Sequence, residues 1–308
     1  MSIVVTVPHA RLAENIGSVP EGAELLIWDM QSPAPRDRLD IVVPPYMGGS
    51  SVLGALQGLD VGLVQSQSIG YDGVAESLPS GLHFANAASV HETSTAELAM
   101  ALMLASQRQF PRFVLAQDRS EWSPVFAESL ADRRVLLVGF GGVGEAIATR
   151  LRPFEVELTV VARTARTVRH DTLGEVRVHG VDELAALLPD AEIVVLTLPG
   201  GDETRHLFDD ETLSLMRDGA LLVNVGRGTL VDTDALVRQE GRIRAALDVV
   251  DPEPLPEEHP LWKTEGVLLS PHVGGASTAM NPRIARLIRT QIERMLQGEE
   301  PLNLVIGN

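Results

Sequence analysis

Short apolar runs alternate with helical stretches along the whole 308-residue chain. In its first third, β-branched and aliphatic runs recur between turns at residues 3–7, 25–28, 41–43, 62–65 and 83–85. A helical stretch at 94–107 follows and ends before Pro111. This alternation predicts a parallel sheet whose strands are joined by crossover helices.

A second series of apolar runs repeats the pattern more regularly, at 134–138, 158–161, 193–198, 221–225, 245–249 and 267–269. Six buried strands with intervening helices describe a doubly wound sheet. A last helical stretch at 282–296 is expected to pack back onto the first lobe. We therefore expect an α/β protein of two lobes, a substrate domain at 1–98 completed by 279–308 and a dinucleotide-binding domain at 99–278.

Composition narrows the classes of partner. Hydrophobic residues make up 44% and charged residues 22%, as in a soluble globular protein. The net charge of −17 opposes binding to nucleic acid and to anionic membrane surfaces. The chain has no cysteine, which fits a reducing compartment, and neither a basic leader nor an apolar run of membrane-spanning length. A cytoplasmic protein is expected.

A glycine-rich loop follows the run at 134–138 and precedes a stretch of helical composition. It reads Gly139-Phe140-Gly141-Gly142-Val143-Gly144. In this strand-to-helix context, G-x-G-x-x-G is the fingerprint of dinucleotide binding. Its glycines permit a tight turn and close approach of a pyrophosphate, which the first amides of the helix face. The loop predicts a Rossmann domain.

The end of the next expected strand indicates which dinucleotide is bound. NAD-binding domains usually place Asp or Glu there, about 20 residues after the loop, to hold the ribose hydroxyls. This chain has Ala162-Arg163-Thr164-Ala165-Arg166 instead, with no carboxylate. Because arginine pairs bidentately with phosphate, the stretch favours the 2′-phosphate of NADP(H), with NAD(H) possible. A solvated basic loop is the alternative interpretation.

Three turns follow the last expected strands, where an open α/β sheet binds its ligands. They span 224–229, 247–256 and 270–277, and they contain Arg227, Glu253 and His272. Singly, each residue is more often an ordinary surface group. Their joint occurrence after successive strands, downstream of a phosphate loop, favours a catalytic site.

Together with 68–72, 86–90 and 95–98, these motifs resemble the D-isomer-specific 2-hydroxyacid dehydrogenase family, in particular its glyoxylate and hydroxypyruvate reductase-like members. The resemblance spans nearly the whole chain. It implies a flavodoxin-like substrate domain, an active site between the lobes, and transfer of hydride from NAD(P)H to a 2-oxo acid to give a D-2-hydroxy acid. By resemblance, Arg227 binds the substrate carboxylate and keto oxygen, Glu253 orients His272, and His272 donates the proton.

Independent chemistry agrees with these roles. Adding a hydride to a ketone builds negative charge on its oxygen, so an acid and a fixed cation should both face that atom. Histidine is the natural acid, and a neighbouring carboxylate raises its pKa. Arginine matches a carboxylate and supplies the local positive charge that an acidic chain needs to hold an anion.

The fingerprint and the resemblance together give the remaining contacts. Expected cofactor contacts are Gly139, Phe140, Gly141, Gly142, Val143, Gly144, Arg163, Thr164, Arg166, Leu198, Pro199, Thr204, Val225, Gly226, Asp248, His272 and Gly274. Expected substrate contacts are Tyr46, Met47, Ile69, Gly70, Arg227 and His272. For Asp248, helix capping is the rival role. No metal site is expected.

The first lobe also limits the substrate. Loops 44–50 and 64–68 contain no basic residue, which disfavours phosphorylated substrates. Tyr46 and Met47 indicate a partly apolar pocket, so glyoxylate, hydroxypyruvate and larger 2-oxo acids stay open. The resemblance further implies a homodimer joined through the cofactor domain, with 110–130 as the candidate segment.

Two alternatives remain. Formate dehydrogenases share the fold, but their histidine pairs with glutamine, and Glu253 argues against them. A nicotinamide-sensing scaffold, such as the C-terminal binding protein corepressors, keeps the same three residues while acting through protein contacts. Fold alone does not decide between catalysis and sensing.

Overall fold

The computed structural model describes residues 2–307, which form two units. One unit comprises the residues up to His91 together with those from Gly275 onward, and the other comprises Glu92–Gly274. The boundaries expected after residues 98 and 278 differ from these. The reason is that helix α3 (Glu92–Gln107) packs as one piece against strands β11 (Leu221–Asn224) and β12 (Arg244–Leu247) of the second unit.

The sheet of the first unit has six strands in the order β14-β5-β4-β3-β1-β2. Five strands are parallel and the edge strand β14 is antiparallel to β5. The parallel part has the strand order 2-1-3-4-5, which confirms the flavodoxin-like expectation. The strands are β1 (Ile3–Val7), β2 (Ala23–Ile27), β3 (Arg38–Val42), β4 (Asp60–Gln65), β5 (Phe84–Ala85) and β14 (Leu304–Ile306).

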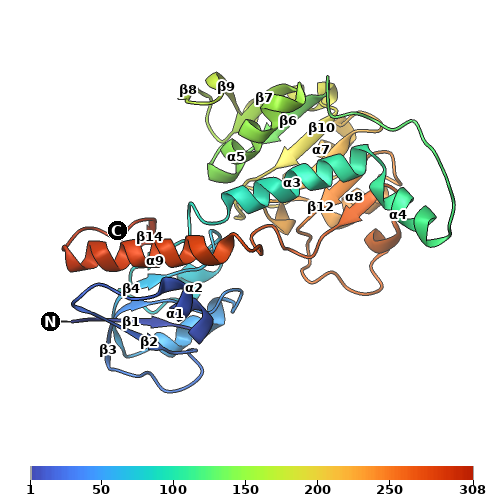
Figure 1. The fold of residues 1–308 in the computed structure, drawn as a ribbon. Coiled ribbons are helices and arrows are strands. Elements are labelled where there is room, and N and C mark those ends of the chain that lie inside the picture. The colour runs from blue at the N-terminus through green and yellow to red at the C-terminus, as the bar shows by residue number, and fades with distance from the viewer. Residues whose placement is uncertain (1, 308) are drawn as a thin grey trace. The chain divides into compact units, whose positions relative to one another are not determined.

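Helices cover both faces of this sheet (Figure 1). Ile41 packs in one layer and Val42 in the other, because successive residues of a strand point to opposite faces. Burial on both faces explains why these strands read as continuous apolar runs. On one face lie α1 (Ala10–Ile16) and α9 (Met280–Leu296), and on the other lie η1 (Ser50–Leu56) and α2 (Val74–Ser77).

The sheet of the second unit has eight strands in the order β13-β12-β11-β10-β6-β7-β9-β8. With the edge strand β8 left out and β6 counted as the first strand, the run from β9 to β12 has the Rossmann order 3-2-1-4-5-6, which confirms that expectation. All neighbours are parallel except β8 and β9. The strands not yet given are β6 (Arg134–Val138), β7 (Glu157–Ala162), β8 (Arg166–His170), β9 (Gly174–Gly180), β10 (Ile193–Leu196) and β13 (Val267–Leu269).

The expected count of six strands for this unit was wrong, because β8 and β9 form a hairpin that the apolar pattern does not show. Strand β8 reads Arg166-Thr167-Val168-Arg169-His170, and it is a strand because its backbone pairs with β9. Arg166, expected in a loop, is the first residue of this edge strand. Strands β10, β11 and β12 also end before the apolar runs do, so that Leu198 and Val225 lie in the following turns.

Two layers of helices also enclose the second sheet. One layer contains α3 and α5 (Gly142–Leu151), and the other contains α6 (Leu184–Leu187), α7 (Asp210–Leu215) and α8 (Thr233–Arg238). Helix α4 (Phe110–Asp118) follows α3, and short 3-10 turns occur at 152–154, 181–183, 188–190, 228–230 and 260–263.

Within residues 2–307, no helix combines the length and the apolar character needed to span a bilayer.

Candidate active site

The glycine loop joins β6 to α5 and packs tightly against its own sheet. A Cβ on Gly139 would collide with the hydroxyl of Thr197, and one on Gly144 would collide with the carbonyl oxygen of Gly139. A Cβ on Gly141 would meet no atom within 4 Å. The space over Gly141, beside the N-terminus of α5, is therefore an open cradle of the kind that a dinucleotide pyrophosphate needs. Gly142 and Val143 form the first turn of this helix.

The basic residues after β7 extend the loop on one side. The Arg166 guanidinium donates hydrogen bonds to the carbonyl of Phe140, at 3.2 Å, and to that of Thr164, at 3.3 Å. Arg163 lies 3.8 Å from Glu203, and both side chains are 81% exposed. Because an exposed ion pair of this kind contributes little, the Arg163 guanidinium can turn to another anion at small cost. The structure thus ties Arg166 to the glycine loop and leaves Arg163 in an exposed ion pair nearby in the sequence.

The turn after β10 lies on the other side of the loop. Leu198 is half-buried and Pro199 exposed. A Cβ on Gly226 would come within 2.7 Å of the Leu198 carbonyl oxygen, so the turns after β10 and β11 touch there. The Thr204 hydroxyl donates to the carbonyl of Pro199 at 2.9 Å, which ties it to its own turn.

Arg227 lies in a turn that the side chain of Asn224 stabilises by hydrogen bonds to the backbone. The Asn224 side chain, fully buried at the end of β11, donates to the Arg227 carbonyl at 2.8 Å and accepts from the Gly226 amide at 3.0 Å. The half-buried Arg227 side chain donates to the Gly226 carbonyl at 2.7 Å. A Cβ on Gly228 would collide with the Val250 carbonyl, so this turn packs directly against the segment after β12.

Glu253 and His272 form a hydrogen-bonded pair. Glu253 Oε1 lies 2.5 Å from His272 Nδ1, and the two side chains are 38% and 41% exposed. This hydrogen bond is the largest influence on the pKa of His272 and raises it. Burial and the charge of Arg227 act in the opposite direction, while the charges of Glu253 and Asp248 also raise it. The net effect raises the pKa of His272 above its ordinary value, which suits a group that donates a proton near neutral pH.

Asp248 fixes the loop that carries His272. Its buried carboxylate accepts from the Ser270 hydroxyl at 2.7 Å and from the amides of Val273 and Gly274 at 2.9 and 2.8 Å. The amide of His272 donates to the Asp248 carbonyl at 2.7 Å. No helix begins at Asp248, so the rival role as a helix cap is wrong. These bonds support the left-handed backbone at His272, where φ is 52°.

The candidate substrate residues of the first unit lie in two loops. Ile69 and Gly70 are half-buried, and the Asn86 amide fixes their loop by donating to the Ile69 carbonyl at 2.9 Å. The ring of Tyr46 stacks on buried His91, with ring centroids 5.7 Å apart. Met47 is 63% exposed, so it presents apolar surface at the tip of its loop.

At the carboxyl ends of its strands, the second unit places the open space at Gly141, the half-buried guanidinium of Arg227 and the hydrogen-bonded pair of Glu253 and His272. Such a set can hold an anionic substrate and donate a proton to an oxygen on which negative charge develops.

Sequence reasoning missed Asn224 as the residue that shapes the Arg227 turn. A buried asparagine at a strand end, directly before Gly-Arg-Gly, is the turn signal that could have identified it.

Comparison with known proteins gives a consistent result. Residues 100–274 match the family model described as "D-isomer specific 2-hydroxyacid dehydrogenase, NAD binding domain". The glyoxylate reductase of Pyrococcus horikoshii is 33% identical over 79% of this chain and 75% of that protein. The glyoxylate reductase of Pyrococcus furiosus is 30% identical over 98% of this chain and 94% of that protein.

A solved structure agrees over the whole length. The D-isomer-specific 2-hydroxyacid dehydrogenase of Xanthobacter autotrophicus, crystallised with NADPH and MES, superposes with a TM-score of 0.81 and 26% identity. The match covers 99% of this chain and 98% of the other.

Proposed function

This chain belongs to the D-isomer-specific 2-hydroxyacid dehydrogenase family, and from that premise we propose which residues perform its reaction and which cofactor it prefers. It is a nicotinamide-dependent oxidoreductase that reduces a 2-oxo acid. We propose that the second unit binds the cofactor and that the product is the D-2-hydroxy acid. The open cradle at Gly141, where a side chain would fill the space needed for a pyrophosphate, is the observation that carries the cofactor assignment.

Arg227, Glu253 and His272 are the proposed catalytic group. The bound cofactor supplies the hydride. Arg227 holds the substrate carboxylate and stabilises the charge that develops on the keto oxygen. Because Glu253 occupies Nδ1 of His272, the proton passes to that oxygen from Nε2. Through the same hydrogen bond, Glu253 keeps the ring oriented.

The substrate contacts proposed in the first unit are the backbone amides of Ile69 and Gly70 and the side chains of Tyr46 and Met47. Amides suit a carboxylate, and the exposed apolar surface of Met47 suits a non-ionic substituent on the 2-oxo acid. The missing basic residue in both loops argues against a phosphate ester. Glyoxylate, hydroxypyruvate and larger unphosphorylated 2-oxo acids are therefore the proposed class.

NADPH is the proposed cofactor. Its 2′-phosphate would be bound by Arg163, Thr164 and Arg166. The bonds from Arg166 to the glycine loop support this choice, as does the weak pairing of Arg163. The remaining proposed contacts lie in the turns after β10 to β13. They are Leu198, Pro199, Thr204, Val225, Gly226, Asp248 and Gly274, in addition to the glycine loop. Since the Asp248 carboxylate already accepts three hydrogen bonds, we expect it to act mainly by holding the His272 loop.

One set of assays tests the activity and the cofactor preference together. Oxidation of NADPH and of NADH is followed by absorbance with glyoxylate, hydroxypyruvate, pyruvate, phenylpyruvate and a branched 2-oxo acid. We expect faster oxidation with NADPH. In Arg163→Ala, the KM for NADPH should rise on the order of tenfold, because a charge-assisted bond to phosphate is lost, while the KM for NADH stays constant.

Arg169→Ala is the matched control, since Arg169 is an exposed arginine on the neighbouring strand β8. It should change neither constant. Equal losses with both cofactors in Arg163→Ala would mean that Arg163 does not read the 2′-phosphate. Tight cofactor binding without oxidation by any of the five acids would favour a sensing scaffold.

We also propose a homodimer joined through segment 110–130. Large apolar side chains are exposed on this segment, with Trp122 at 96%, Phe126 at 105% and Val114 at 63%. A concentration of exposed large apolar side chains within one segment is a feature of interaction sites. A second copy of the same surface, related by a two-fold axis, would cover it symmetrically.

Sedimentation velocity tests the dimer. We expect the wild type to have twice the monomer mass of 33.2 kDa and Phe126→Asp to have the monomer mass, since a charge would be buried without a partner. Ile27→Asp is the control, because Ile27 is an exposed apolar residue in the first unit. A monomeric wild type, or a dimer that survives Phe126→Asp, would rule out this interface.

A further inference from the structure

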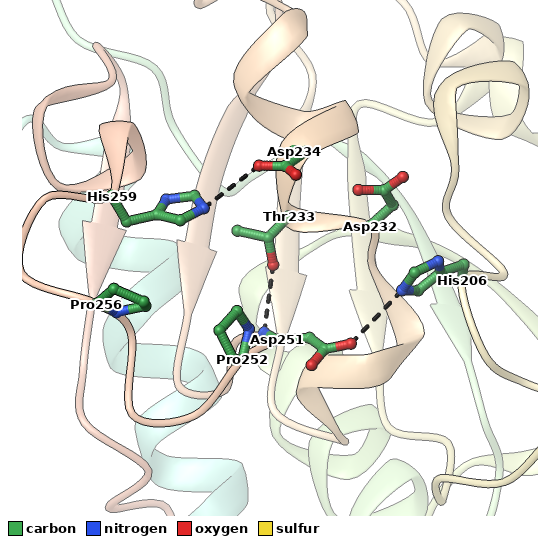
Figure 2. Close-up of a pocket in the computed structure, with 8 residues that line it drawn as sticks. All are labelled: His206, Asp232, Thr233, Asp234, Asp251, Pro252, Pro256 and His259. Carbon is green, nitrogen blue, oxygen red and sulfur yellow. Dashed lines mark hydrogen bonds and ion pairs between the residues drawn. The ribbon is translucent and has the colours of Figure 1, made fainter.

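A cavity of about 280 Å³ is lined by several ionisable groups and by residues on both sides of Glu253 in the sequence. Figure 2 shows the side chains that line it, among them Asp251, two residues before Glu253. The described residues contain no group of histidine, aspartate and glutamate that could hold a metal ion. Three of the lining residues, Asp251, Pro252 and Pro256, belong to the segment that carries Glu253.

Asp251 has fixed partners at both its backbone and its side chain. Its amide donates to the Thr233 hydroxyl at 3.2 Å, and its carboxylate lies 3.5 Å from His206 Nε2, as Figure 2 shows. Arg205 lies 3.4 Å from the same carboxylate oxygen. The Asp251 side chain is 26% exposed, so these charges are partly shielded from water.

The partners of Asp251 are themselves anchored. Thr233 is buried and is the first residue of α8, where the Asp232 side chain caps the helix by accepting from the Ala235 amide at 3.0 Å. The backbone amide of His206 donates to the Thr229 carbonyl at 2.7 Å. Asp251 is therefore held from two separate parts of the second unit, the start of α8 and the segment that contains Arg205 and His206.

The backbone between Asp251 and Glu253 has little freedom. The turn reads Asp251-Pro252-Glu253-Pro254, and each proline fixes its own φ and restricts the residue before it. A displacement of Asp251 is therefore passed on to Glu253 rather than absorbed between them.

From these contacts we infer that Asp251 is a positioning residue, which holds Glu253 Oε1 against His272 Nδ1 through its bonds to Thr233, Arg205 and His206. Asp251 acts through Glu253 and does not touch the substrate. The inference rests on the proposed roles of Glu253 and His272.

The pH profile of kcat/KM shows this role directly. His272 must be protonated to act as the acid, so reduction is fast below its pKa and is lost as the pH rises through it. The groups that influence His272 are Glu253, Asp248 and Arg227, and its hydrogen bond to Glu253 is the largest influence raising its pKa. Loosening Glu253 should lower this pKa and move the alkaline limb of the profile to lower pH.

Two variants distinguish a displacement of Glu253 from the loss of the negative charge at Asp251. Asp251→Asn removes the ion pairs but also a negative charge, whose loss would by itself favour the neutral imidazole. Thr233→Val removes only the hydroxyl that accepts from the Asp251 amide and changes no charge. We expect both to move the alkaline limb down by roughly half a pH unit or more, and Thr233→Ser to restore the wild-type profile.

Asp234→Asn is the matched control in the same cavity. Asp234 lies 3.4 Å from His259 Nε2 on the opposite side and has no bond to the 251–254 turn (Figure 2). Its profile should match the wild type. A shift in Asp251→Asn equal to that in Asp234→Asn, with Thr233→Val unchanged, would show a charge effect alone and overturn the inference.

The experiment distinguishes failure of the positioning role of Asp251 from failure of the proposed enzymatic function. If the wild type reduces no 2-oxo acid, the proposed function fails. If the wild type is active and Thr233→Val keeps its alkaline limb, the positioning role fails. Should Asp251→Asn not fold, as judged by cofactor binding, the comparison of Thr233→Val with Thr233→Ser still decides the question.

Discussion

Replacing His272 with glutamine is expected to slow turnover of the 2-oxo acid by a factor on the order of 100 or more, because the group that protonates the keto oxygen is lost. Glutamine keeps a polar side chain of similar length but cannot act as an acid near neutral pH. The alkaline limb that wild-type His272 gives to the pH profile should disappear as well. Stopped-flow or steady-state rates in the reduction direction measure both effects.

Affinity for the cofactor separates this role from a structural one. The dissociation constant of NADPH, measured by fluorescence, should change little in His272→Gln. His179→Gln is the matched control, since His179 also pairs with a carboxylate, Glu183, at 2.8 Å on β9. A His272→Gln variant that loses cofactor affinity as strongly as turnover would contradict the acid role.

Arg227→Gln is expected to have an effect at least as large, with kcat/KM falling by a factor on the order of 1,000. The guanidinium both binds the substrate carboxylate and stabilises charge on the keto oxygen, so KM should rise and kcat should fall together. Because the acidic chain carries a net charge of −17, no long-range attraction for an anion replaces it. Initial rates over a range of 2-oxo acid concentrations give both constants.

Arg238→Gln is the control for removing an arginine. Arg238 makes an exposed ion pair with Asp210 at 2.6 Å, and its loss should leave both constants near the wild-type values. A rise in KM without any fall in kcat in Arg227→Gln would restrict Arg227 to substrate binding. Unchanged kinetics would remove it from the site altogether.

The parts of this molecule that could be predicted are those whose residues act through local chemistry. The glycines of the loop predicted its tight turn, because positions 139 and 144 have no room for a Cβ. Continuous apolar runs identified the buried parallel strands, because both faces of each sheet are covered.

The parts that could not be predicted depend on partners distant in the sequence. Strand β8 contains a single apolar residue, Val168, and exists because β9 pairs with it. The buried carboxylate of Asp248 is engaged by a loop more than twenty positions later. Likewise, nothing local to Thr233 indicates that its hydroxyl supports the turn before Glu253.

The discontinuity of the first unit has a consequence for synthesis on the ribosome. Helix α9 supplies Ile284, Ile288 and Ile292 to the core of that unit, and β14 closes one edge of its sheet. The second unit is contiguous and can be completed once residue 274 has left the exit tunnel, whereas the first must wait for the last part of the chain. Until then, α1 is the only one of the two helices that covers this face, so part of the apolar surface of the nascent sheet stays exposed and favours aggregation of the incomplete chain.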